Sequence, residues 1–263
     1  MTTDLHAQYL ANGFVHLSGI FTGHEVATAR HAVAHLPDWA RQESSDHNIQ
    51  RLQPLQTCPA VADPAWIKAF YNNPRLDSLV DAIFNGTIVP TPRMSCDIQL
   101  TGLLIEPREH WWSTGLHRDY RDLVADLDVA AWWARTKDLR LFNQVNIPLC
   151  PDDSLWVIPG SHDRADNTDE ADLVAARGRV RDCREHPSQQ TDAFRAELTD
   201  AIEACGAINI RAQPGDVVLY RSNILHCGVY EPGVERLTLH DGIYSREWHQ
   251  YVLEVFGRDA ATA

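Results

Sequence analysis

Two histidines and one aspartate have residue types and a spacing suited to a mononuclear iron site. His117 and Asp119 form a His-x-Asp triplet, and His226 lies far downstream. Two imidazoles and one carboxylate can occupy one face of an Fe(II) ion and leave its other positions open for a co-substrate and dioxygen. Side chains two residues apart on a strand share a face, so the triplet would present both donors together.

An arginine follows the second histidine at a distance of ten residues. Arg236 and Thr238 alternate with Leu237 and Leu239, so the polar set would face the inside of a barrel. A buried arginine needs an anionic partner, and a guanidinium can clamp a carboxylate through paired hydrogen bonds. The far carboxylate of a 2-oxoacid would be that partner, with the Thr238 hydroxyl as a second donor. Iron ligands plus a clamp predict an oxygenase that consumes a 2-oxoacid.

Each of these features also has an ordinary structural interpretation. The triplet is a short motif in a chain with 13 histidines, and His226 alone could be a buried core histidine. Arg236 could pair with Glu235 or Asp241 at the surface. The combination of the triplet, the distant histidine and the arginine is much more specific than any part of it.

The composition excludes several classes of partner. The chain has 263 residues, of which 44% are hydrophobic, so one domain with a substantial core is expected. A net charge of −13 argues against nucleic acid, although a few arginines inside a cleft can still bind a small anion. No apolar run predicts a membrane span. The six cysteines are scattered, and the lack of a Cys-x-x-Cys pair argues against a zinc ribbon. We expect free cysteines in a protein of the reducing cytoplasm. The oligomeric state is left open.

The order of elements predicts a β-barrel wrapped by helices. Residues 1–90 are expected to be mostly helical, with a capped helix from Asp4 to Asn12 and a capping box at Thr22 that opens a helix through about Leu36. Six later segments have strand character: 97–105, 139–149, 154–158, 207–211, 216–220 and 236–245. Residues 163–206 are predicted to be a helical insertion. We therefore expect a mainly β fold with surrounding α-helices.

Four motifs together resemble the phytanoyl-CoA dioxygenase family of Fe(II)/2-oxoglutarate oxygenases. They are the opening segment 9–15, the triplet in 116–119, the turn and strand in 151–162, and the segment 214–226 followed by Arg236. Asp153-Ser154 replaces the usual Asn-Gly of the third motif. The resemblance implies a double-stranded β-helix (jelly-roll, cupin-like), with helices on one outer face, in a single domain of residues 1–263.

The same resemblance implies the roles of individual residues. Iron would be bound by three of them, His117, Asp119 and His226. Arg236 would hold the far carboxylate of 2-oxoglutarate, and alignment with the family places Gln99 and Phe142 beside that co-substrate. Gln99 could instead be a solvated strand residue and Phe142 plain core. The resemblance implies a cofactor set of Fe(II), 2-oxoglutarate and O2, with ascorbate as a reductant for assays in vitro.

The implied reaction is hydroxylation of a small-molecule C–H bond, with decarboxylation of 2-oxoglutarate to succinate and CO2. Related halogenating enzymes have Gly or Ala at the carboxylate position, so Asp119 favours hydroxylation. Desaturation, epoxidation and rearrangement use the same triad and remain alternatives. A further alternative is a ligand-binding protein that kept the barrel and lost the chemistry.

Aromatic residues around the triplet suggest what the substrate is. The candidate substrate residues are Arg118, Tyr120, Trp111, Trp112 and Trp156. A tryptophan-rich mouth favours an aromatic, polycyclic or cationic ligand, and Arg118 could meet an anionic group. Some of these tryptophans could be core residues instead. His162, in a Pro-Gly-Ser-His turn, is predicted to bond to backbone rather than to metal.

Overall fold

The computed structural model describes residues 4–44, 49–88, 101–177, 191–243 and 245–256. The strands are β1 (Phe14–Leu17), β2 (Arg51–Leu52), β3 (Gly102–Ile105), β4 (Trp112–Ser113), β5 (Asn143–Pro148), β6 (Asp152–Val157), β7 (Ile208–Ala212), β8 (Val217–Arg221), β9 (His226–Tyr230) and β10 (Leu237–Gly242). They form two antiparallel sheets, ordered β1-β8-β5-β10-β3-β2 and β4-β9-β6-β7.

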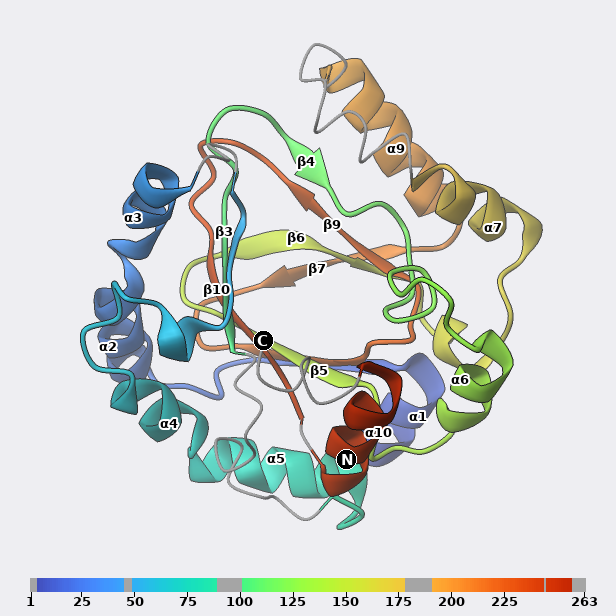
Figure 1. The fold of residues 1–263 in the computed structure, drawn as a ribbon, viewed down its shortest axis with the longest axis horizontal. Helices are drawn as coiled ribbons and strands as arrows, with labels where there is room; N and C mark the ends of the chain where they lie inside the picture. The colour runs from blue at the N-terminus through green and yellow to red at the C-terminus, as the bar shows by residue number, and fades with distance from the viewer. Residues whose placement is uncertain (1–3, 45–48, 89–100, 178–190, 244, 257–263) are drawn as a thin grey trace.

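Helices surround the two sheets. They are α1 (Leu5–Asn12), α2 (Gly23–Val33), α3 (Leu36–Glu43), α4 (Ala65–Tyr71), α5 (Pro74–Phe84), α6 (Val129–Arg135), α7 (Thr168–Ala175), α9 (Asp192–Ala204) and α10 (Arg246–Phe256), with 3-10 turns η1 (Leu55–Thr57) and η2 (Ser161–Asp163). Figure 1 shows α2, α3, α4 and α5 outside the six-stranded sheet, while α7 and α9 lie beyond the four-stranded sheet. No helix among the described residues is long and apolar enough to cross a membrane.

Local capping explains where the first helices begin and end. The Asp4 side chain accepts from the Ala7 N–H at the start of α1, and Gly13, with φ 78°, ends that helix. Thr22 and Glu25 form the predicted capping box of α2. These helix starts are confirmed, but α2 ends at Val33 and a separate helix, α3, follows it.

The main core lies between the six-stranded sheet and helices α1–α5. Alternate residues of β10, Leu237 and Leu239, are buried there beside Ile147 of β5. Burying a leucine fully contributes about 1.5–3 kcal/mol, so this face holds the helices on the sheet. The opposite face of the same strand carries Thr238 and His240, as the alternation predicts. The helices therefore cover one face of the sheet and leave the other for the site.

The register of the six-stranded sheet places one residue each from β2, β3 and β10 in a row. Arg51 of β2 pairs with Leu104 of β3, and Leu104 pairs with Thr238 of β10. Directly paired residues point to the same face of a sheet, so these three side chains share the face that carries Thr238.

The predicted fold class is confirmed, with differences at several strand ends. The strand expected over 139–149 begins only at Asn143, because Phe142 has a positive φ of 59°. Residues 97–100 of the first predicted strand lie outside the described residues. Helices α7 and α9 fall within the predicted insertion 163–206. The division into a single domain with these parts stays a prediction.

Candidate metal and co-substrate site

Backbone hydrogen bonds bring the three candidate metal ligands together. His117 and His226 form an antiparallel bridge in which each N–H donates to the other's carbonyl at 3.0 Å. The Asp119 N–H donates to the Ser222 carbonyl at 2.9 Å, just before β9. Residues more than a hundred positions apart are thus fixed side by side by main-chain contacts.

The three side chains converge on one point. Nε2 of His117 lies 3.4 Å from Oδ1 of Asp119, and Nε2 of His226 lies 3.9 Å from Oδ2. All three potential ligand atoms are within 4.8 Å of one another, and no other such cluster of His, Cys, Asp or Glu occurs in the described residues. The predicted convergence is present, with both imidazoles buried.

The protonation of these groups fits a divalent metal. Nδ1 of His117 is 2.8 Å from the Gly115 carbonyl, and Nδ1 of His226 is 2.9 Å from the Ile224 carbonyl. A carbonyl oxygen can only accept, so each proton belongs on Nδ1 and each Nε2 lone pair is free toward the centre. Burial and the neighbouring His117 lower the pKa of His226 to about 4, which keeps it neutral near pH 7. Two neutral imidazoles and a carboxylate suit Fe(II).

Asp119 is held as an anion and oriented by an amide. Burial alone would raise its pKa, but the adjacent imidazoles of His226 and His117, which become cationic in acid, hold that pKa well below the usual range. Nε2 of Gln144, on β5, donates to Oδ2 of Asp119 at 2.6 Å. Such outer contacts fix the direction of a ligand carboxylate. Gln144 is not recognisable from the sequence, because its role depends on how β5 lies beside the triplet.

Arg236 is buried and only partly paired. Its Nε donates to Oδ2 of Asp152 at 2.9 Å, and the Thr238 hydroxyl donates to the same oxygen. The side chain of Arg236 is 5% exposed, yet its Nη1 has no hydrogen-bond partner among the described residues. A buried donor without a partner costs about 1–3 kcal/mol, and a carboxylate in the adjacent cavity would supply the missing acceptor. The arginine therefore fits the far end of 2-oxoglutarate.

An aromatic pair supports the guanidinium. The guanidinium carbon of Arg236 lies 4.4 Å from the ring centroid of Tyr230, which stacks on Trp112 with centroids 4.9 Å apart. The Tyr230 ring lies over Gly228, where an added Cβ would be 1.9 Å from the tyrosine hydroxyl. A glycine at this position of β9 is what lets the stack form.

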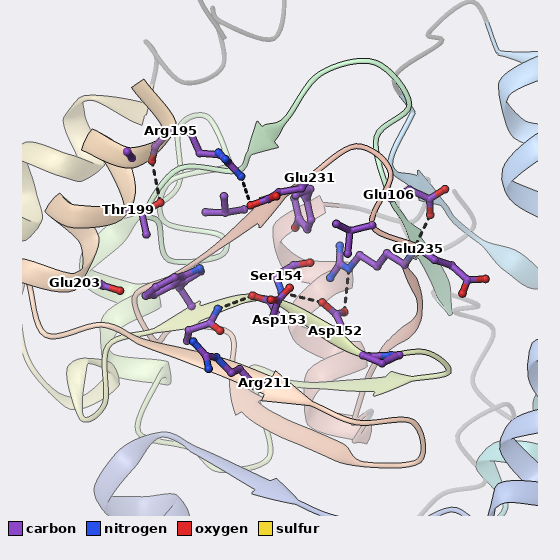
Figure 2. A pocket seen from close by; sticks show the side chains of 18 of the residues that line it. Glu106, Asp152, Asp153, Ser154, Arg195, Thr199, Glu203, Arg211, Glu231 and Glu235 are labelled. Atoms are coloured by element: carbon purple, nitrogen blue, oxygen red, sulfur yellow. Dashed lines mark hydrogen bonds and ion pairs between the residues drawn. The ribbon is translucent and has the colours of Figure 1, made fainter. Parts of the chain in front are cut away.

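Two cavities meet at this arginine. The triad and Arg236 line an inner cavity of about 480 Å³, together with Trp112 and Tyr120. Such a volume is typical of sites for small molecules. An outer cavity of about 490 Å³ lies between the small sheet and α9 and shares Tyr230 and Arg236 with the inner one. Figure 2 shows the outer cavity, where Arg195 of α9 reaches the carboxylate of Glu231.

Arg118 does not lie where a substrate could meet it. Its guanidinium is fully buried and donates to Asp166 and to the carbonyls of Ser161 and Asn223. It is not among the residues that line the inner cavity. The prediction that Arg118 meets an anionic substrate group is therefore not supported, because the side chain instead joins the triplet to the turn after β6.

The other predicted residues divide between the cavity and the core. Trp112 and Tyr120 line the inner cavity, as expected for substrate contacts. Trp111 is buried against Phe194 of α9, and Trp156 lines the outer cavity instead. Phe142 is buried in an aromatic cluster with Tyr120 and is absent from the inner lining, which matches its alternative as core. Gln99 lies outside the described residues.

His162 has the structural role that the turn predicts. Its Nε2 is 3.1 Å from the Leu10 carbonyl at the end of α1, and its ring packs against Gly13. The Ser161 hydroxyl accepts from the Leu225 N–H at 2.8 Å. These bonds tie α1 and the turn to the segment that enters β9, and His162 takes no part in the metal cluster.

Solved structures with this arrangement of sheets and helices share little sequence with the chain. AviO1 from Streptomyces viridochromogenes Tue57 has a TM-score of 0.55 at 14% identity, over 90% of this chain and 91% of that one. EctD from S. alaskensis, solved with 2-oxoglutarate and 5-hydroxyectoine, gives 0.53 at 14%, over 91% and 74%. The non-heme alpha ketoglutarate dependent epimerase SnoN from nogalamycin biosynthesis gives 0.53 at 12%, over 90% and 77%. These similarities establish the fold alone.

Sequence comparison identifies the family. No curated protein sequence matches the chain significantly. The profile of the phytanoyl-CoA dioxygenase (PhyH) family matches residues 9–228, a span that contains the whole triad and most of the chain. Arg236 lies just beyond the matched span. With the converged triad, this match places the chain in the phytanoyl-CoA dioxygenase family of Fe(II)/2-oxoglutarate-dependent dioxygenases.

Proposed function

We propose that this enzyme hydroxylates a C–H bond of a small molecule and converts 2-oxoglutarate to succinate and CO2. The observation that carries the proposal is the convergence of the triad in the same cavity as a buried arginine with an unpaired Nη1. The triad can bind one face of a metal ion, and Arg236 can bind a carboxylate in the same cavity. A 2-oxoacid oxygenase requires both.

The triad residues would hold the metal in a fixed orientation. His117 and His226 present Nε2, because their Nδ1 protons are committed to backbone carbonyls. Asp119 presents a carboxylate whose second oxygen is held by Gln144. Bound Fe(II) would supply the oxidative chemistry, activating dioxygen at the cost of 2-oxoglutarate. Since Asp119 fills the carboxylate position, hydroxylation is favoured over halogenation.

Arg236 would bind the far carboxylate of 2-oxoglutarate through its Nη edge. Asp152 holds Nε, so the guanidinium is fixed before the co-substrate arrives. The Thr238 hydroxyl has one hydrogen and donates it to Asp152. In our proposal Thr238 therefore supports Asp152, instead of acting as the second direct donor that the sequence suggested.

The remaining lining would position the substrate and keep water away. Trp112 and Tyr120 offer aromatic surface, while Leu123, Val124 and Leu155 supply apolar contacts. Apolar lining excludes water from the reacting centre and strengthens the polar contacts within it. Desaturation, epoxidation and rearrangement would use the same residues, so the structure of the product distinguishes them from hydroxylation.

Succinate formation tests the proposal. The protein is incubated in air with Fe(II), 2-oxoglutarate, ascorbate and a panel of small molecules, and succinate and products are measured. His117→Ala should abolish turnover. Arg236→Ala should raise the KM for 2-oxoglutarate roughly 10- to 100-fold, the value of a charge-assisted hydrogen bond of about 1.5–3 kcal/mol.

The control replaces an arginine outside the inner cavity. Arg211→Ala, in the outer cavity, should leave the turnover rate and the KM for 2-oxoglutarate unchanged. Full activity of His117→Ala would refute the site. Binding of 2-oxoglutarate without any succinate across the panel would favour the ligand-binding alternative.

A further inference from the structure

Arg51 lies at the inner cavity without a counter-charge. Most arginines of the described residues pair with a carboxylate, as expected in a chain with 36 acidic and 23 basic residues. The exposed Arg51 side chain lines the cavity and has no hydrogen bond or ion pair with any described residue. Arg51 is thus an unpaired cation at the inner cavity of a protein with a net negative charge.

The sheet directs Arg51 toward the cavity. Arg51, Leu104 and Thr238 are paired in one row across β2, β3 and β10, and they share a face. Arg51 is two strands from Thr238, roughly 10 Å away. Its Nε would lie 3.5 Å from a Cβ on Gly102, the neighbour of Leu104 on that face. The side chain therefore lies against β3, near the co-substrate end of the site but separate from it.

The charge of Arg51 reaches groups inside the cavity. After burial, it is the largest cause that holds the pKa of His240 well below its usual value. Nδ1 of His240 is 2.7 Å from Oδ1 of Asn146, so this neutral imidazole is already engaged. Among the described lining residues the only carboxylate is Asp119, which belongs to the triad. Nothing described in the cavity neutralises Arg51.

We propose that Arg51 binds an anionic group of the substrate, so that the substrate is a small organic carboxylate. This inference rests on the proposed function. Arg236 is already balanced by Asp152 and faces the co-substrate, whereas Arg51 has its full charge available. The apolar body of the substrate would lie against Leu104, Leu155 and Trp112, which line the same cavity. A guanidinium can bind a carboxylate through two parallel hydrogen bonds.

Matched acid and amide probes test the assignment. The protein is loaded with Fe(II) and saturating 2-oxoglutarate under nitrogen, and three pairs are titrated by calorimetry: 2-naphthoate, cyclohexanecarboxylate and phenylacetate, each against its primary amide. At least one acid should bind about three- to tenfold more tightly than its amide. Arg51→Gln should remove this preference, Arg51→Lys should retain part of it, and Arg51→Glu should reverse it.

Arg211→Gln is the matched control, because Arg211 is also exposed and unpaired among the described residues but lines the outer cavity. It should keep the preference of the wild type. No preference for any acid, a preference unchanged in Arg51→Gln, or displacement of 2-oxoglutarate by the acid would overturn the assignment. A separate titration of 2-oxoglutarate distinguishes the two proposals. If it binds normally, only the Arg51 subsite has failed; if it does not bind, the proposed function has failed.

Discussion

Asp152 shares one carboxylate oxygen between Arg236 and Thr238 in a buried setting. Burial would raise the pKa of Asp152, but the charge of Arg236 and the hydrogen bond from Thr238 lower it overall. Removing one partner from a buried ion pair leaves the other charge uncompensated. The ion pair is thus part of the fold and also of the proposed co-substrate site.

We expect Asp152→Ala to destabilise the protein by about 3–5 kcal/mol, because the guanidinium of Arg236 loses its only ion-pair partner among the described residues. Added 2-oxoglutarate should recover more stability in this variant than in the wild type, since its carboxylate would replace the missing charge. Thermal unfolding with and without 2-oxoglutarate measures both effects.

The neighbouring Asp153 provides the control for this prediction. It is exposed, and Asp153→Ala should change neither the unfolding temperature nor the response to 2-oxoglutarate. Equal shifts with 2-oxoglutarate in Asp152→Ala and wild type would show that the co-substrate does not approach Arg236.

The sequence predicted residues that are recognisable by type and spacing, and it missed those that act through pairing. His117, Asp119 and His226 stand out because metal ligands are few in kind. Gln144 and Asp152 are ordinary polar residues whose partners are set by the register of β5, β6 and β10. The substrate role predicted for Arg118 fails for the same reason. Its neighbours in sequence line the cavity, but its own contacts are with the turn after β6.

Among the strands, β9 carries both a candidate metal ligand, His226, and the aromatic ring that supports Arg236. His226 begins the strand and Tyr230 ends it, with Gly228 between them on the same face. The Tyr230 ring fills the space above Gly228, which places it against Trp112 and Arg236. A side chain at position 228 must therefore displace the tyrosine.

Gly228→Ala should raise the KM for 2-oxoglutarate several-fold while leaving metal affinity nearly unchanged. The added Cβ would sit 1.9 Å from the Tyr230 hydroxyl, so the ring must move and Arg236 loses its stacking partner. His226 is held by its backbone bridge to His117 and should stay in place. Co(II) absorption titrations and steady-state kinetics separate the two quantities.

Gly23→Ala is the comparison for this substitution. An added Cβ at Gly23, the first residue of α2, meets nothing within 4 Å. Its kinetics should equal those of the wild type. If Gly228→Ala lost metal and co-substrate affinity equally, the separation of β9 into two functions would be wrong.

Elements with clear local signals were predicted well, and short ones were not. The caps at Asp4 and Thr22 fixed the starts of α1 and α2. The two-residue strand β2 is too short to show alternation, so Arg51 could not be placed at the site from sequence. The register that brings Arg51 into line with Thr238 is a property of three strands, which no single segment reveals.

Across the whole molecule, several histidines are buried in neutral form. Burial lowers the pKa of both His162 and His226 to about 4, from an ordinary value of 6.5. Between these values the unfolded chain binds more protons than the folded one. The stability that these two groups contribute is therefore full above pH 6.5 and is lost as the pH falls toward 4.

The metal-free protein should therefore lose stability between about pH 6.5 and 4, by up to about 3 kcal/mol for the fully buried His226. Thermal unfolding at pH 7.5, 6 and 5 measures the slope. His162→Gln should flatten it, whereas substitution of the exposed His24 by Gln should leave it unchanged. A constant unfolding temperature over this range would contradict the prediction.

The overall architecture was predictable because its signals are distributed along the chain. Helix caps in the first 90 residues, alternating segments after them and the family motifs all indicated a helix-covered barrel, which the two sheets confirm. The outer cavity was not predictable, since it depends on where α9 lies against the small sheet.

The stack of Trp112 on Tyr230 places a natural fluorophore one ring away from the clamp guanidinium. Indole emission responds to nearby charge, so binding of a dicarboxylate at Arg236 would change the intrinsic tryptophan fluorescence of the protein. Subtracting the spectrum of a Trp112→Phe variant would isolate that signal from the seven other tryptophans. Tryptophan fluorescence would then report occupancy of the proposed co-substrate site without a label and without turnover.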